Sequence, residues 1–173
     1  MSDIRLVTAT IDLEYEEVSE NAERFEREFN AINESEENSI TQGIKHAKNR
    51  GELDESSTLI LNVLVELYRK MDKMEYMLTH GSSKRLPLSS NALIESIGLE
   101  HFKITSQLLE VGKHYYARIE MATFPRREVA FYFEAIEPTL AKIEKMHVRD
   151  QEAWGHYMTA CERIMIRQMK GLE

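Results

Sequence analysis

The sequence predicts an α+β protein: a small antiparallel β-barrel that long helices interrupt after its first strand, followed by a C-terminal helix. Three observations support this prediction. Residues 5–15 alternate between apolar and polar side chains, residues 16–80 repeat with the period of a helix, and residues 88–148 form several short segments rich in aliphatic and aromatic residues. Because a lone strand is not stable by itself, the first strand must pair with the later ones, and the helices between them are an insertion.

The first strand is predicted over residues 5–15, RLVTATIDLEY. Apolar side chains at every second position lie on one face of a strand, and here they are Val7, Ala9, Ile11, Leu13 and Tyr15. The positions between them carry threonine and acidic residues. We therefore expect a strand that is buried on one face and solvated on the other.

The period changes at the end of this strand. Apolar residues then recur at steps of four and three, which predicts an amphipathic helix over residues 16–33 with the stripe Val18, Ala22, Phe25, Phe29 and Ile32. The polar run 33–39 interrupts it, and a short helical stripe follows as far as Gly51. Asp54 is the expected N-cap of a further helix, and Gly81 is its expected C-terminal stop.

Residues 59–78, LILNVLVELYRKMDKMEYML, carry a heptad repeat. Its a positions are Leu64, Met71 and Leu78, and its d positions are Ile60, Leu67 and Met74. Leu or Met at a with Ile or Leu at d favours tetramers over dimers. We therefore expect an intermolecular coiled coil, and an ordinary core-facing helix is the alternative.

From Leu88 onward the helical period is lost. The predicted β segments are 91–102, 113–122, 127–137 and 139–148. The third should be buried on one face and partly covered on the other, and its buried face carries Val129, Phe131, Phe133 and Ala135. A final helix is predicted over about 150–170 with Asp150 as its N-cap, and its stripe is Trp154, Tyr157, Met158, Cys161, Ile164 and Met165.

These predictions divide the chain into the first barrel strand (1–15), an inserted helical oligomerisation region (16–82) and the remainder of the barrel with its C-terminal helix (83–173). The net charge of −8 disfavours a nucleic acid as partner. No run approaches the roughly 20 apolar residues that span a bilayer. The N-terminus also lacks the pattern of a signal peptide, so we expect no membrane insertion and a cytoplasmic location.

The sequence contains no recognisable catalytic or metal-binding motif. A glycine-rich phosphate loop and a nucleophile motif are both missing. The six histidines are scattered, with no two of them three or four positions apart, and the single Cys161 has no ligand partners at metal spacing. We therefore expect no enzymatic activity, no metal and no cofactor.

Four basic residues lie in loops of the predicted barrel: Lys84, Arg85, Arg126 and Arg127. Guanidinium groups at a barrel mouth suit bidentate binding of phosphate or carboxylate. Turn residues that serve only solubility are the alternative.

The order of five segments carries a resemblance to a known family. They are SIGLEHF (96–102), LLEVGKHYYARIEM (108–121), RREVAFYFEAIE (126–137) with AKIEKMHV (141–148), and the helix over 150–168. From about Arg85 to Lys170 the chain resembles the PilZ domain, a six-stranded bacterial barrel that receives the second messenger cyclic di-GMP. With long helices after its first strand, it also looks like the tetrameric PilZ variant of xanthomonads, in which such helices form a parallel four-stranded coiled coil.

The ligand-binding signature of that family is incomplete in this chain. The family pattern is Arg-x-x-x-Arg followed by Asp/Asn-x-Ser-x-x-Gly. No arginine stands four residues after Arg85, and the second motif is reduced to Ser96 and Gly98 behind Glu95, with a different spacing. Each lost charge-assisted hydrogen bond costs about 1.5–3 kcal/mol, so the resemblance implies weak or absent binding of cyclic di-GMP.

The resemblance therefore implies a non-enzymatic signalling adaptor. We expect it to assemble as a homo-oligomer, with a tetramer favoured, and to act through other signalling proteins of a cyclic di-GMP pathway, such as one that governs motility or virulence. The alternative is a structural coiled-coil scaffold that is unrelated to nucleotide second messengers.

Overall fold

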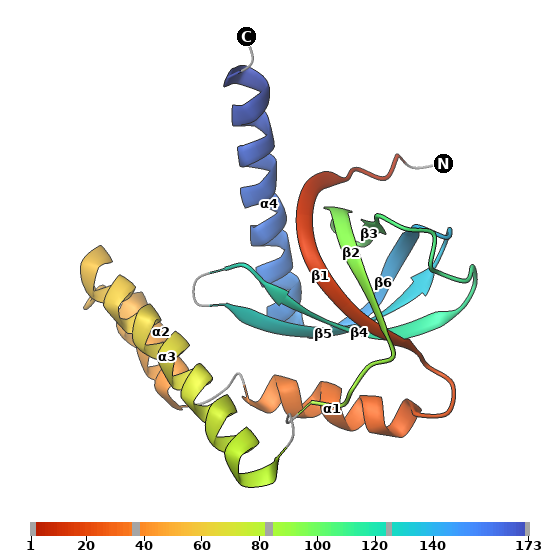
Figure 1. Ribbon diagram of the computed structural model, residues 1–173. Coiled ribbons are helices and arrows are strands. Elements are labelled where there is room, and N and C mark those ends of the chain that lie inside the picture. The colour runs from red at the N-terminus through yellow and green to blue at the C-terminus, as the bar shows by residue number, and fades with distance from the viewer. Residues whose placement is uncertain (1–2, 36–38, 82–84, 124–125, 172–173) are drawn as a thin grey trace. The chain divides into compact units, whose positions relative to one another are not determined.

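The computed structural model describes residues 3–35, 39–81, 85–123 and 126–171 (Figure 1). The chain divides into two compact units, and each is described by itself. The first unit comprises Met1–Phe25, Leu88–Met121 and Glu128–Glu173, and the second comprises Glu26–Pro87 and Ala122–Arg127. The chain thus leaves the first unit after its first strand and returns to it at Leu88.

The described residues of the first unit form a closed, six-stranded antiparallel β-barrel. In their order around the barrel the strands are β1 (Val7–Glu17), β2 (Ser90–Ile97), β3 (His101–Ile104), β6 (Leu140–Met146), β5 (Arg127–Ala135) and β4 (His114–Met121). β1 pairs with β2 on one side and with β4 on the other. The strand that precedes the helices therefore closes the barrel, as the sequence predicts.

The barrel interior is filled by the alternating side chains predicted for β1 and β5. The five apolar residues of β1 are between 1% and 5% exposed. Phe133 of β5 is fully buried, and its ring centroid lies 5.0 Å from that of Phe102 and 5.1 Å from that of Tyr115. This aromatic cluster is the centre of the core, and it confirms the period of two in both strands.

The helix α4 (Val148–Gly171) contributes to the same core and extends beyond the barrel (Figure 1). Trp154 and Met158 are 2% and 8% exposed. The predicted stripe is wrong at Ile164, which is 54% exposed, whereas the next residue, Met165, still packs against the core. At about 100° per residue, Ile164 is turned to the side of the face that carries Trp154 and Met165. The predicted N-cap is also wrong, since the helix begins at Val148 and Asp150 is buried within its first turn.

Three further helices follow β1: α1 (Ala22–Ser35), α2 (Ser39–Asn49) and α3 (Glu55–His80). In the second unit α2 lies against α3. The predicted ends of α3 are confirmed. Asp54 Oδ1 accepts a 2.7 Å hydrogen bond from the Ser57 amide, and Gly81, at a φ of 69°, donates its amide to the Met77 carbonyl at 2.8 Å. Glycine is favoured at that position because a φ above zero is costly for other residues.

Two predicted boundaries differ from the structure. The helix expected from residue 16 begins at Ala22, because β1 continues to Glu17 and the Val18 amide still donates to the His114 carbonyl at 2.9 Å. The segment 91–102 is two strands, β2 and β3, which a turn at Gly98 separates. None of the described helices combines the length and apolar content needed to cross a membrane.

Candidate functional site

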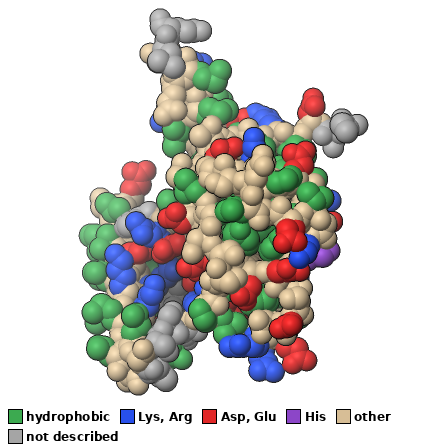
Figure 2. Space-filling model, turned by 45° about the vertical axis from the view of Figure 1, so that its right-hand side comes forward, with side chains coloured by type: hydrophobic (Ala, Val, Ile, Leu, Met, Phe, Trp, Pro, Cys, Tyr) green, Lys and Arg blue, Asp and Glu red, His purple; other side chains and the backbone are tan. Residues whose placement is uncertain are grey.

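The predicted heptad positions form an exposed apolar row on α3, which we call the α3 seam: Ile60, Leu64, Leu67, Met71, Met74 and Leu78. Their side chains are between 51% and 85% exposed. Hydrophobic side chains are visible on the surface of the second unit (Figure 2). The seam is therefore a continuous apolar surface that the described chain does not cover.

A different face of α3 is turned toward its own unit. Val65 is only 8% exposed, and the Glu66 carboxylate accepts a 3.0 Å hydrogen bond from the amide of Arg126. The residues beside the seam are also apolar and partly exposed, with Val63 at 42% and Tyr68 at 49%. The helix is thus apolar on two sides, as its sequence predicts. One of these sides, which carries Val65, is buried within the unit.

The predicted anion-binding residues fall in different units. Arg85, Arg126 and Arg127 belong to the second unit, and Lys84 lies outside the described residues. Arg126 is exposed, and its backbone amide donates to the Glu66 carboxylate. Arg127 is the first residue of β5. Arg126 and Arg127 therefore lie at the start of β5, whereas Arg85 lies in the segment that leads to β2.

Ser96 and Gly98 belong to the first unit, at the end of β2 and in the turn after it. Gly98 has a structural role there. A Cβ at this position would lie 2.5 Å from the Arg5 carbonyl oxygen, and the Gly98 amide donates to the His101 carbonyl at 2.7 Å. The chain requires glycine here because the segment that precedes β1 passes too close for a side chain.

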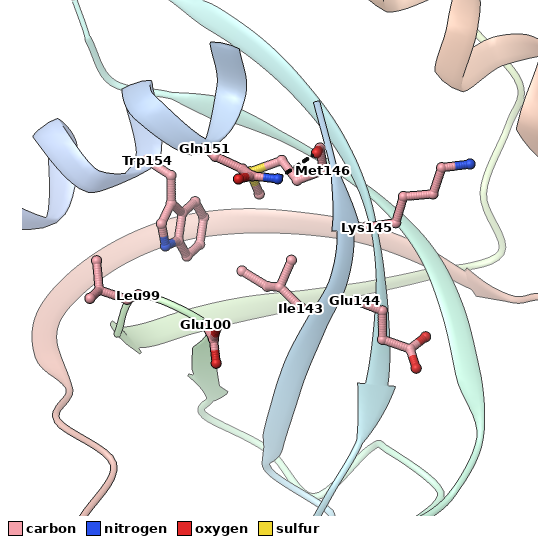
Figure 3. A pocket seen from close by; sticks show the side chains of 8 residues that line it. All are labelled: Leu99, Glu100, Ile143, Glu144, Lys145, Met146, Gln151 and Trp154. Atoms are coloured by element: carbon pink, nitrogen blue, oxygen red, sulfur yellow. Dashed lines mark hydrogen bonds between the residues drawn. The ribbon is translucent and has the colours of Figure 1, made fainter. Parts of the chain in front are cut away.

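The first unit also contains a hollow of about 360 Å³ beside this turn, between β6 and the first turns of α4. Its lining residues are Leu99, Glu100, Ile143, Glu144, Lys145, Met146, Gln151 and Trp154. Figure 3 shows the apolar members of this set around one space, with Glu100 projecting from the turn at its lower side. This volume lies within the range of about 300–1,000 Å³ that is typical of small-molecule sites.

Hydrogen bonds fix the walls of the hollow. The Trp154 Nε1 donates to the Gly98 carbonyl at 2.7 Å, and the Gln151 Nε2 donates to the Met146 carbonyl at 2.8 Å. Both side chains are therefore held in place before any ligand arrives. Sequence reasoning did not find this site, because it combines the β2–β3 turn with β6 and α4, which come much later in the chain and share no motif with it.

No activated nucleophile or metal site is found among the described residues. Burial raises the pKa of the Cys161 thiol, which keeps it in its less reactive protonated form. Burial likewise raises the pKa of Tyr157, which is hydrogen-bonded to that thiol, to about 12. In the described ranges, no three His, Cys, Asp or Glu side chains are grouped so that they could hold one metal ion.

Comparison with known proteins gives no match. No family model matches the chain, and neither the curated proteins nor the solved structures contain a significant match.

Proposed function

We propose that this chain is a PilZ-like, non-enzymatic signalling adaptor that assembles through the α3 seam, with a tetramer favoured. It acts through contacts with other proteins of a cyclic di-GMP pathway and binds the messenger weakly or not at all.

The observation that carries the self-assembly is the exposure of every seam residue, from 51% at Leu67 to 85% at Leu78. Burying one side chain of this kind contributes about 1.5–3 kcal/mol. The whole row is therefore large enough to offset the cost of association, about 4–15 kcal/mol. A second copy of the chain is the occupant that fits, because a heptad repeat pairs with a helix of the same repeat.

The architecture supports the PilZ-like part of the proposal. The described strands close a small antiparallel barrel, and the long helices enter after its first strand. This is the arrangement that the resemblance implies. A fold alone does not specify a ligand, so the cyclic di-GMP pathway is inferred from the resemblance of the segments.

The local geometry supports weak binding of the messenger. Gly98 stands where the family motif ends. The Arg5 backbone passes close to its Cα, and its carbonyl accepts a hydrogen bond from Trp154. The Arg126 amide is bound to Glu66. Without the second arginine of the family pattern, the phosphates lose their charge-assisted hydrogen bonds.

The self-assembly is tested by light scattering after gel filtration. The wild type should be tetrameric, and Leu64→Glu with Leu67→Glu should give monomers with unchanged far-UV circular dichroism. Leu59→Glu is the matched control, because Leu59 is 58% exposed on the same helix but lies outside the a and d positions. A monomeric wild type, or equal dissociation by Leu59→Glu, would rule out the seam.

The signalling part is tested separately. Titration with cyclic di-GMP should give no tight binding, and a submicromolar dissociation constant at physiological salt would contradict the proposal. Affinity capture with the wild type and the double seam variant should recover proteins that make, degrade or bind cyclic di-GMP. Recovery of none of these would favour the structural scaffold instead.

A further inference from the structure

The hollow of the first unit combines an apolar interior with one unengaged carboxylate. Figure 3 shows Leu99, Ile143, Met146 and Trp154 around the same space. Glu100 projects from the β2–β3 turn at its lower side. Within the described part of the chain, its carboxylate makes no ion pair or hydrogen bond.

The other two charged residues of the lining are engaged elsewhere. Glu144 Oε2 lies 2.8 Å from the Nδ1 of His114, and the Lys145 ammonium lies 5.5 Å from the centre of the Tyr132 ring. Figure 3 shows both side chains directed away from Trp154, on the far side of β6. Glu100 is therefore the charged residue of the lining whose side chain no other described group engages, and Figure 3 shows its carboxylate at the lower rim of the space.

We propose that this hollow binds a small amphipathic cation, in which an apolar body fills the space beside Trp154 and a positive charge pairs with Glu100. This site is independent of the α3 seam, because all of its residues belong to the first unit and the seam belongs to the second.

The charge of the expected ligand follows from the groups at the site. The positive end of the α4 dipole would favour an anion, but Asp150 is buried in the first turn of that helix and offsets it. The indole N–H, which could otherwise donate to an anion, already donates to Gly98. The Gln151 amide is likewise engaged with Met146.

The affinity should be modest. A probe with about nine non-hydrogen atoms, at a typical binding energy per atom, has a dissociation constant of about 1 mM. Leu99, at the edge of the hollow, is 71% exposed, so a bound ligand would stay partly in contact with solvent on that side.

Trp154 is the only tryptophan of the chain and lines the hollow, so its fluorescence reports occupancy directly. The probe is 2-phenylethylammonium, with neutral 2-phenylethanol and anionic phenylacetate as matched controls of the same shape. We expect a saturable change in Trp154 emission with the cation. Phenylacetate should bind at least about fivefold more weakly, as expected for one partly solvated charge.

Two variants separate the site from general effects. Glu100→Gln should weaken binding of the cation about fivefold and leave 2-phenylethanol unaffected. Glu137→Gln, at an exposed carboxylate in the β5–β6 turn of the same unit, should change nothing. Both positions are exposed, so neither substitution should affect folding, and thermal melts check this.

The proposal is overturned if the cation produces no saturable change at ten times the expected dissociation constant. Equal affinities for the three probes would overturn it as well, and so would a Glu100→Gln variant that binds like the wild type. Loss of self-assembly in the seam variants should leave this binding intact.

Discussion

The indole Nε1 of Trp154 donates a 2.7 Å hydrogen bond to the carbonyl oxygen of Gly98 and so joins α4 to the β2–β3 turn. Trp154 is 2% exposed, and its ring centroid lies 6.2 Å from that of Phe131 in the barrel core. The helix is therefore part of the barrel core at this end, and the same contact forms one wall of the hollow.

Replacing Trp154 with Phe should destabilise the first unit. The Gly98 carbonyl would lose its donor in a buried position, which costs about 1–3 kcal/mol, and the smaller ring would leave a void. The free energy of unfolding, measured by urea denaturation with circular dichroism, should fall by at least that amount. Leu99→Ala is the control, because this exposed residue of the same hollow should change stability by no more than about 0.5 kcal/mol.

Gly98→Ala should also be destabilising, although the substitution adds only one methyl group. The new Cβ would meet a backbone oxygen at 2.5 Å, so the backbone of either segment must move. Such overpacking typically costs about 1–3 kcal/mol. Gly155→Ala is the matched control in the same unit. Its Cβ would meet nothing within 4 Å, and it lies inside α4, so we expect a gain of about 0.5–1 kcal/mol. A Gly98→Ala variant as stable as the wild type would show that the turn is free to move.

Much of the fold follows from local patterns. The alternation in β1 and β5 identified their buried faces, because a strand of a closed barrel has one face in the core. The ends of α3 were predictable from Asp54 and Gly81, whose side-chain acceptor and backbone freedom act within a few residues. The exposure of the α3 seam agrees with the heptad pattern, although its occupant is a proposal.

The features that were predicted wrongly or missed share a cause: each is decided by contacts with segments outside the local pattern. Val18 fits a helical stripe, but its amide donates a hydrogen bond to the His114 carbonyl of another strand. Ile164 fits the α4 stripe, but it is turned to the side of the face that the barrel covers, since Met165 beside it still packs against the core. The hollow was missed because Glu100, Ile143 and Trp154 come together only when the barrel closes.

The contact between His114 and Glu144 should make stability depend on pH. The hydrogen bond to Glu144, with smaller charge effects of Glu144 and Glu134, raises the pKa of His114 above its ordinary value of 6.5. A raised pKa stabilises the fold below 6.5, and this contribution is lost as the pH rises through the raised value. The difference in unfolding free energy between the wild type and Glu144→Gln should therefore be largest below pH 6.5 and should shrink above it.

An NMR titration of His114 tests the same contact directly. Its pKa should lie above 6.5 in the wild type and should move toward 6.5 in Glu144→Gln. High salt should reduce the difference, because the pair is largely exposed. Glu137→Gln should leave it unchanged. An identical pKa of His114 in the wild type and in Glu144→Gln would contradict the contact.

The cap of α3 links the acid stability of that helix to its self-assembly. The backbone and side-chain hydrogen bonds from Ser57 lower the pKa of Asp54 below its ordinary value of 3.8. A lowered pKa gives stability that is present above the ordinary value and is lost as the pH falls through the lowered one. The seam begins at Ile60, within two turns of the cap, so fraying of the first turns would loosen the seam.

Asp54→Ala should therefore increase amide hydrogen exchange in the first turn of α3 and weaken self-association at neutral pH. Asp54→Asn should have a smaller effect, because its side-chain oxygen still accepts from the Ser57 amide but carries no charge. Hydrogen exchange read by mass spectrometry and light scattering at a series of concentrations measure the two effects. If Asp54→Ala exchanged and associated like the wild type, the cap would be irrelevant to the seam, and the start of α3 would be held by its contacts alone.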